Sequence, residues 1–122
     1  MANGFHQKPG IGCNEPFSPV VKHSPIRLVL GLAVSKKGHV RLLDIQNAFL
    51  RGYLTEEVYL KQTAGFIDKQ YLRHVYKLQH SVYGLKQAPR AWFQIFSDFL
   101  LQLGFQESKC DYSLFVFNQR GV

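Results

Sequence analysis

Apolar residues between positions 24 and 38 recur at intervals of three and four, the spacing that places side chains on one face of a helix. Ser24 and Pro25 open this stretch in the order typical of an N-cap residue followed by the first helical position. Lys36, Lys37 and Gly38 follow it as a basic, glycine-terminated end. We therefore expect a helix with Ser24 as its N-cap and its C-terminus just before Gly38.

A second helical pattern begins near Pro89 and carries a broad apolar face as far as Leu103. Pro89 suits the first turn of a helix, where backbone N–H groups have no intrahelical partner, and Gly104 suits the C-terminal cap. The apolar positions of this face are Trp92, Phe93, Ile95, Phe96, Phe99, Leu100 and Leu103. We expect this face to pack in the core.

Shorter apolar stretches predict strands, which lie at residues 39–44, 58–63, 74–78 and 112–117. A short helical turn is expected at residues 47–50, ending at Gly52, and Gly65 marks a loop between the second and third strands. This order of elements predicts an α+β domain with a mostly antiparallel sheet packed on two main helices.

The two ends of the chain differ from this pattern. Residues 1–23 contain glycines and prolines that interrupt helices and central strands, so we expect an extended leader with turns. Residues 118–121 have the composition of a hairpin turn, which needs a returning strand, yet Val122 follows directly. We therefore expect a leader over residues 1–23 and a domain over residues 24–122 that is cut short.

Composition indicates a folded protein and argues against a disordered or membrane-spanning one. The 122 residues are 46% hydrophobic and 14% aromatic, which is too apolar and too rich in rings for a disordered polycation. No apolar run is long enough to span a bilayer, and the first residues lack the pattern of a signal peptide. Cys13 and Cys110 are too far apart for a metal-binding Cys-x-x-Cys motif, which favours a reduced, intracellular protein. The net charge of +7 favours a polyanionic partner.

Asp44 is the acidic residue that lies inside a strongly apolar stretch, at the end of the predicted strand 39–44. A carboxylate in that place can coordinate a hard cation such as Mg²⁺. However, magnesium sites for phosphoryl transfer use two or more carboxylates, and the next acidic residue is Glu56. These residues alone favour the alternative, in which Asp44 is an N-cap for the turn at residues 47–50.

Residues 83–90 combine Gly84, two cations and the start of a helix. Backbone N–H groups at a helix N-terminus favour phosphate, and Lys86 and Arg90 would add positive charge to them. The alternative is an ordinary capped loop whose cations are solvated.

Two longer stretches resemble the reverse transcriptase domain of copia-type LTR retrotransposons. They are LDIQNAFLRG at residues 43–52 and SVYGLKQAPRAWF at residues 81–93. Shorter matching segments are FSPVVK at 17–22, EVYLKQ at 57–62 and SKCDYSLF at 108–115, so the resemblance covers essentially the whole chain. It implies a partial palm of a right-hand polymerase with a remnant of the fingers.

The resemblance also implies roles for individual residues. Asp44 matches the first catalytic aspartate, which is a ligand of the divalent metal ions, here Mg²⁺. Ile45, Ala48 and Phe49 would then lie at the incoming nucleotide, where the Phe49 ring packs against the sugar and excludes a 2′-hydroxyl.

A second set of residues matches the family loop that faces the template strand and the nascent base pair. Its members are Gly84, Lys86, Gln87, Pro89 and Arg90. A glycine in such a loop allows the backbone to approach a nucleotide closely.

The chain departs from the family pattern in two places. The paired aspartates of the family, in a Tyr-Val-Asp-Asp hairpin, would follow residues 112–117, and Val122 is reached first. Asp44 is then the single member present of three catalytic aspartates, so we expect weak Mg²⁺ binding. Asn3 stands where the family usually has a basic residue before Gly-Phe-His-Gln.

The resemblance therefore implies a fragment of an RNA-directed DNA polymerase that is inactive alone, and it leaves open whether the chain is itself an enzyme. The implied partners are an RNA/DNA primer–template and a dNTP, without a membrane, in the cytoplasm, the nucleus or both. The alternatives are a non-catalytic nucleic-acid-binding module and a non-functional transposon remnant.

Overall fold

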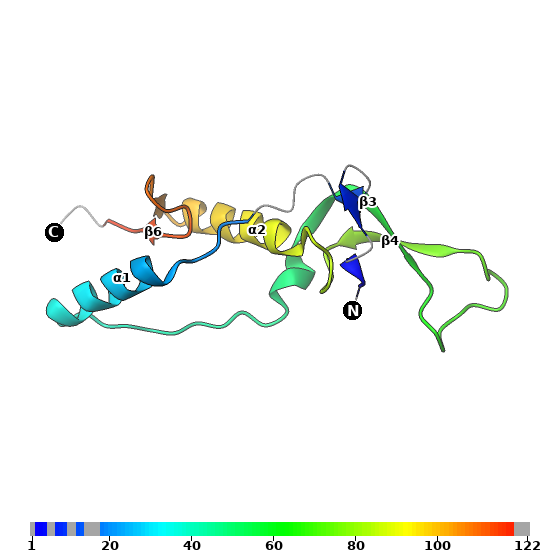
Figure 1. Cartoon of the computed structure of the whole chain (residues 1–122), viewed down its shortest axis with the longest axis horizontal. Coiled ribbons are helices and arrows are strands. Elements are labelled where there is room, and N and C mark those ends of the chain that lie inside the picture. Colours follow the sequence, from blue (N-terminus) through cyan, green and yellow to red (C-terminus); the bar gives the residue numbers. More distant parts are fainter. Residues whose placement is uncertain (1, 5–6, 10–11, 14–17, 119–122) are drawn as a thin grey trace. The chain divides into compact units, whose positions relative to one another are not determined.

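The computed structural model describes residues 2–4, 7–9, 12–13 and 18–118 (Figure 1). Its elements in chain order are β1 (Lys8–Pro9), β2 (Gly12–Cys13), α1 (His23–Ser35), the 3-10 helix η2 (Ala48–Arg51), β3 (Tyr53–Lys61), β4 (Val75–His80), α2 (Ala88–Gln102), β5 (Gln106–Glu107) and β6 (Phe115–Val116). The pairs β3–β4 and β5–β6 are antiparallel, and β1–β2 is parallel. Two main helices with mostly antiparallel strand pairs confirm the α+β prediction.

The chain forms two compact units. The first contains Met1–Ser18 and Asn47–Asp98, and the second contains Pro19–Gln46 and Phe99–Val122. The first unit has a small apolar core whose buried members are Ala2, Val58, Leu85 and Ala88. Phe49, Leu54, Leu60, Leu78 and Val82 pack against it and are partly buried. The core therefore joins β3, β4 and the start of α2 to the first residues of the chain.

The hairpin of β3 and β4 is in register from Val58 opposite Leu78 to Lys61 opposite Val75, and its register is irregular between Tyr53 and Val58. The strand predicted at residues 58–63 thus begins earlier, and the one predicted at 74–78 runs on to His80. Strand limits depend on the partner strand, which the alternation of residue types does not specify.

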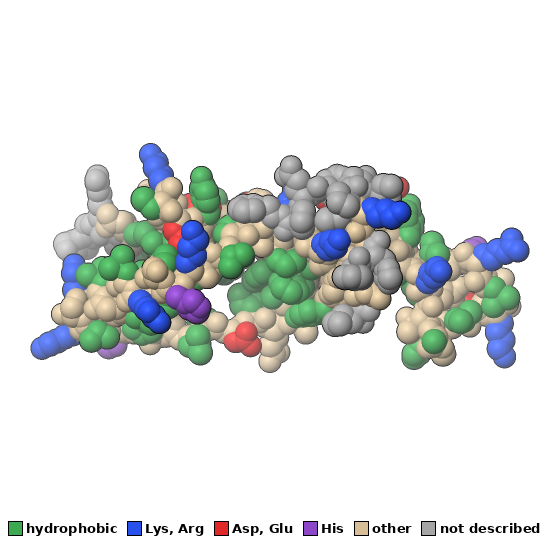
Figure 2. All heavy atoms as spheres, viewed as in Figure 1, with side chains coloured by type: hydrophobic (Ala, Val, Ile, Leu, Met, Phe, Trp, Pro, Cys, Tyr) green, Lys and Arg blue, Asp and Glu red, His purple; other side chains and the backbone are tan. Residues whose placement is uncertain are grey.

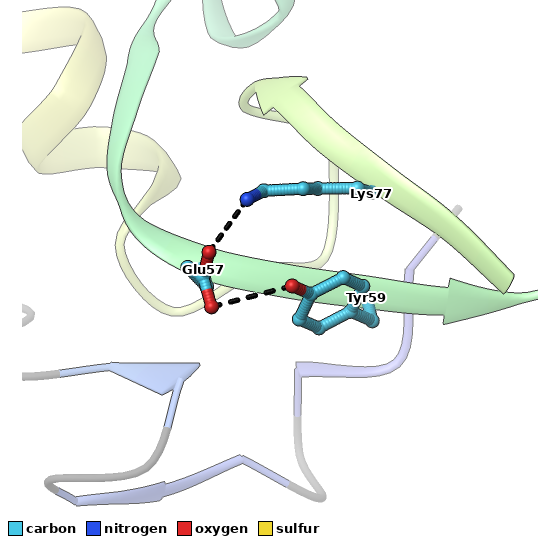
Figure 3. Close-up of polar contacts among 3 residues, drawn as sticks. All are labelled: Glu57, Tyr59 and Lys77. Atoms are coloured by element: carbon cyan, nitrogen blue, oxygen red, sulfur yellow. Dashed lines mark hydrogen bonds and ion pairs between the residues drawn. The ribbon is translucent and has the colours of Figure 1, made fainter.

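Three polar side chains cross this hairpin on an exposed face (Figure 3). Lys77 Nζ donates to Glu57 Oε1 at 2.5 Å, and Tyr59 Oη donates to Glu57 Oε2 at 3.2 Å. The hydrogen bond from Lys77, followed by its charge, lowers the pKa of Glu57, and the same contact raises the pKa of Lys77. Both side chains of this ion pair are largely exposed to solvent, so the pair adds little to the stability of the hairpin. Its main effect is to favour the observed register.

The loop between β3 and β4 is organised around the side-chain amide of Gln62. Its Nε2 donates to the carbonyl oxygens of Tyr71, at 2.7 Å, and His74, at 3.0 Å. Its Oε1 accepts from the backbone N–H of Asp68 at 2.7 Å. One amide thereby supplies partners to three backbone groups of the loop, as side-chain amides commonly do in turns.

The segment at residues 39–44 is not a strand, so that prediction was wrong. It is extended, and Leu42 and Leu43 are 98% and 84% exposed. Within the described part of the chain, no strand pairs with it. An apolar extended segment becomes a strand only when another strand accepts its backbone hydrogen bonds.

The helix α1 begins at His23 with Lys22 as its N-cap, so the prediction that Ser24 is the N-cap was wrong. Pro25 still lies in the first turn, where its missing N–H costs nothing. At the other end, the N–H groups of Lys37 and Gly38 bond to Val34 and Ala33, and Lys37 has a positive φ of 52°. This is a Schellman motif in which Lys37 takes the left-handed position, directly before Gly38.

The helix α2 matches its prediction closely at both ends. Pro89 is its second residue, and Gly104 follows it with a φ of +94° and a bond from Phe105 N–H to the Leu100 carbonyl. Its apolar face is less buried than predicted, because Phe99 and Leu103 are 55% and 52% exposed. Among the described residues, no helix is long and apolar enough to cross a membrane.

The predicted strand at 112–117 is shorter in the structure, where β6 pairs with β5, an element that the sequence pattern did not indicate. Phe105 and Phe117, with ring centroids 5.1 Å apart, hold this pair together. The predicted hairpin turn at 118–121 lies, after Asn118, outside the described residues.

Candidate nucleic-acid interface

The loop at residues 81–90 joins β4 to α2 within the first unit. Burial alternates along it. Leu85 and Gln87 are 5% and 2% exposed, whereas Lys86 and Arg90 are exposed to solvent. Pro89 is half-buried in the first turn of α2. The loop is thus anchored by alternate residues and presents both of its cations outward, as a phosphate-binding surface requires.

The first residues of the chain lie against this loop. The N–H of Ala2 donates to the carbonyl of Tyr83 at 2.7 Å, and the N–H of Gly4 donates to the carbonyl of Gly84 at 2.8 Å. Gly84 has a φ of +96°, and a Cβ on it would collide with the carbonyl oxygen of Ala2. A Cβ on Gly4 would likewise collide with the carbonyl oxygen of Gly84. Gly84 therefore permits the close approach of the chain's own backbone on that side, where the sequence suggested a nucleotide.

Gln7 continues the same contact with its side chain. Its Nε2 donates to Oε1 of Gln87 at 2.9 Å, and its Oε1 accepts from the N–H of Lys86 at 2.9 Å. The Nζ of Lys86 donates to the carbonyl oxygen of Gln7, also at 2.9 Å. Sequence reasoning missed Gln7, although it lies in the Gly-Phe-His-Gln segment that belongs to the family resemblance.

Phe49 and Tyr83 bring the second matching stretch of sequence to the loop. The ring centroids are 5.1 Å apart with an interplanar angle of 49°. Phe49 and Ala48 lie on η2 and are half-buried, and the left-handed Asn47 precedes them as N-cap. Two residues that the sequence assigns to a nucleotide, Ala48 and Phe49, are thereby held beside the loop that it assigns to the template.

A pocket of about 320 Å³ lies in the first unit between β3 and the first turns of α2. Its lining residues are Tyr53, Thr55, Glu56, Gln87, Arg90, Ala91 and Gln94. Two of the predicted template residues, Gln87 and Arg90, form part of its wall. The lining of the pocket includes one acidic side chain, Glu56, one basic side chain, Arg90, and several uncharged polar groups. It can therefore bind polar groups, but it does not select one chemical class.

Asp44 and Ile45 belong to the second unit, on the extended segment that follows α1. Both are exposed, with 42% of Ile45 accessible. The alternative that Asp44 caps the turn at 47–50 was wrong, because Asn47 is the N-cap of η2. The loop at 81–90 belongs to the first unit.

A divalent metal site needs more ligands than the described residues provide at one place. In that part of the chain, no three His, Cys, Asp or Glu side chains gather around a common point. Asp44 supplies one carboxylate, whereas a two-metal phosphoryl-transfer site uses two or more carboxylates together with substrate phosphates. The donor set of the described residues does not fit a complete two-metal site.

Exposed cations also follow the outer part of the β3–β4 hairpin, where Figure 2 shows Lys and Arg side chains at its end. They are Lys61, Lys69 and Arg73. Tyr71 and Leu72, which are 51% and 69% exposed, lie between the last two. Cations interleaved with exposed rings are typical of surfaces that bind single-stranded nucleic acid.

Comparison with known proteins shows similarity to one family over almost the whole chain. A family model described as "Reverse transcriptase (RNA-dependent DNA polymerase)" matches residues 1–121. The chain is 51% identical over 99% of its length to "Retrovirus-related Pol polyprotein from transposon RE1" of Arabidopsis thaliana. It is 50% identical over the same share to the corresponding RE2 polyprotein, and 48% identical over 82% to that of transposon TNT 1-94 of Nicotiana tabacum.

The chain spans only 8% of the length of each of these relatives. No solved structure matches it.

Proposed function

Because this chain belongs to the reverse transcriptase (RNA-dependent DNA polymerase) family, we propose that its first unit contacts the primer–template and the incoming dNTP in RNA-directed DNA polymerisation. It is a fragment that matches copia-type Pol polyproteins. Reverse transcriptases as a family bind nucleic acid and dNTP and use divalent metal ions. The observation that carries the proposal is the contact between the Phe49 and Tyr83 rings, which joins the two longer segments of the family resemblance at one surface.

Each of the chain's own groups has a distinct task in this proposal. Lys86 and Arg90 bind backbone phosphates of the template, because both cations are exposed beside the buried Gln87. The Phe49 ring packs against the sugar of the nucleotide and leaves no room for a 2′-hydroxyl. Gly84 and Pro89 shape the backbone of the loop, and Ala48 contacts the triphosphate, to which the family resemblance also assigns Ile45.

Asp44 has a separate role. We propose that it is one carboxylate ligand of a Mg²⁺ site whose other ligands lie outside this chain. With a single carboxylate, the chain alone is expected to bind Mg²⁺ weakly and to transfer no nucleotides. The chain therefore represents part of a palm with a remnant of the fingers, divided near residue 23, and acts in the cytoplasm or the nucleus.

Primer–template binding tests the surface. Fluorescence anisotropy with a labelled RNA template–DNA primer duplex is expected to show affinity that falls steeply as salt rises from 50 to 200 mM, by analogy with a slope of about −0.9 per phosphate neutralised. A Lys86→Ala/Arg90→Ala variant should make this slope shallower by roughly 2. A Lys36→Ala/Lys37→Ala variant loses the same charge from the end of α1 and serves as the matched control. Absent or salt-insensitive binding would contradict the proposal.

Primer extension with Mg²⁺ and a homopolymer template distinguishes the hypothesis that the chain is a polymerase from the alternative that it is a non-catalytic nucleic-acid-binding module. We expect binding without nucleotide incorporation above background. Incorporation that Asp44→Ala abolishes would show that the fragment is an enzyme by itself.

A further inference from the structure

Gln7 joins the N-terminal segment to the loop at residues 81–90 through both halves of its side-chain amide. The donor half bonds to Gln87 and the acceptor half bonds to the N–H of Lys86, each at 2.9 Å. The side chain of Gln7 is half-buried and that of Gln87 is 2% exposed. The bond to Gln87 is part-buried, so solvent cannot fully replace it and its loss leaves the buried Gln87 amide with fewer partners, whereas the bond from the Lys86 N–H is exposed.

The chemistry of the two contacts selects an amide. One atom must donate to a carbonyl-type oxygen while a neighbouring atom accepts from a backbone N–H, and a glutamine side chain does both from one planar group. A glutamate of the same size offers two acceptors, and a leucine offers neither. The residue type at position 7 thus matches the loop that it contacts.

Lys86 is fixed from two directions by the same residue. Its N–H bonds to the Gln7 side chain and its Nζ bonds to the Gln7 carbonyl oxygen at 2.9 Å. An ammonium group has three donors, so Nζ can keep this bond and still donate to a phosphate oxygen. Ordering the long Lys86 side chain in advance removes part of the entropic cost of binding a phosphate.

Backbone hydrogen bonds of the N-terminal segment bring Gln7 to Lys86. The N–H groups of Ala2 and Gly4 bond to the carbonyls of Tyr83 and Gly84, and the N–H of Gln7 bonds to the carbonyl of Gly4 at 3.0 Å. These bonds place Gln7 level with residues 86 and 87. The described residues of the N-terminal segment therefore clamp the loop, and Gln7 is one of their points of attachment.

We propose that Gln7 is a positioning residue for nucleic-acid binding: it holds Lys86 and Gln87 in the arrangement that presents Lys86 to a template phosphate. This inference rests on the proposed function of the loop. Gln7 itself touches no nucleic acid and acts through Lys86.

The experiment compares Gln7→Leu and Gln7→Glu with Gln102→Leu, which removes an exposed amide of α2 as the matched control. Amide hydrogen exchange of Lys86 is followed by NMR in the 122-residue chain, together with anisotropy on the labelled primer–template. We expect the Lys86 amide to exchange about tenfold faster in Gln7→Leu, because its N–H loses its hydrogen bond to the Gln7 side chain, and primer–template affinity to fall severalfold. Gln7→Glu keeps the acceptor for the Lys86 N–H and should lie between Gln7→Leu and the unaltered chain.

Hydrogen exchange of the amides in β3 and β4 shows whether a Gln7 substitution acts only on the loop or on the whole first unit. A positioning role predicts that they keep their protection while the salt slope of binding becomes shallower by roughly 1, as for one lost phosphate contact. Unchanged exchange at Lys86 in both Gln7 variants, or an equal loss of protection throughout β3 and β4, would overturn the proposal. If the unaltered chain fails to bind primer–template while Lys86 still responds to Gln7, the clamp stands and the proposed function of the loop fails.

Discussion

The ring of Phe49, on η2, packs against the ring of Tyr83, the residue that precedes Gly84, with centroids 5.1 Å apart. The two residues are far apart in sequence, and each belongs to one of the two longer stretches that carry the family resemblance. Their contact places a residue assigned to the nucleotide sugar directly beside the start of the loop assigned to the template. The first unit thereby brings together two parts of the candidate surface without any contribution from the second.

Phe49→Ala is expected to lower the free energy of unfolding by roughly 1–3 kcal/mol, because it removes a half-buried ring and that ring's contact with Tyr83. Thermal or urea unfolding followed by circular dichroism measures this change. Phe66, which is 79% exposed, provides the control substitution Phe66→Ala, and this should leave the transition almost unchanged. Equal effects at the two positions would show that the ring contact contributes nothing.

Gly84→Ala should release the N-terminal segment from the loop. The substitution places a Cβ against the Ala2 carbonyl and also imposes a positive φ on a residue with a side chain. Gly65→Ala isolates the second effect, since Gly65 has a φ of +89° with nothing near its Cβ position. We expect about 1 kcal/mol of destabilisation at Gly65 and distinctly more at Gly84. Hydrogen exchange at Ala2 and Gly4 should rise only in the Gly84 variant.

Ser81→Ala is expected to leave stability unchanged or to raise it by up to about 1 kcal/mol. Ser81 is fully buried, and its hydroxyl oxygen has no hydrogen-bond partner among the described residues. Ser113→Ala is the informative contrast, because that hydroxyl donates to Asp111 Oδ1 at 2.6 Å. Urea unfolding of both variants measures the difference, and a large loss of stability at Ser81 would reveal a partner for its hydroxyl.

The ion pair of Glu57 and Lys77 predicts a pH window for order in the hairpin. The pKa of Glu57 is lowered, so its contribution is present above the usual carboxyl value of 4.5 and is lost as pH falls through the lowered pKa. The pKa of Lys77 is raised, so its contribution is present below 10.5 and is lost as pH rises through the raised pKa. The pair therefore supports the hairpin between these limits.

NMR titration of the Glu57 carboxyl carbon checks this window. The apparent pKa of Glu57 should return toward its usual value in Lys77→Gln, whereas Lys69→Gln, which removes a cation elsewhere on the same hairpin, should not move it. Insensitivity of Glu57 to Lys77 would contradict the assigned cause.

Local signals in the sequence predicted several features of this structure correctly. Pro89 and Gly104 mark the two ends of α2, and Gly52 ends the short turn of η2. These features depend on the backbone preferences of single residues and of their immediate neighbours, which are properties of the sequence itself. The family was likewise determined by two stretches of sequence, before any contact was known.

Tertiary structure decided the features that need a distant partner. The segment at 39–44 has the composition of a strand but no strand beside it within the described part of the chain. The approach of Ala2 to Gly84, and the bonds from Gln7 to Lys86 and Gln87, connect residues about 80 positions apart. The sequence by itself determined local conformation and family, whereas only the folded chain showed what surrounds each candidate residue, because packing and hydrogen bonding across the chain are set by three-dimensional proximity.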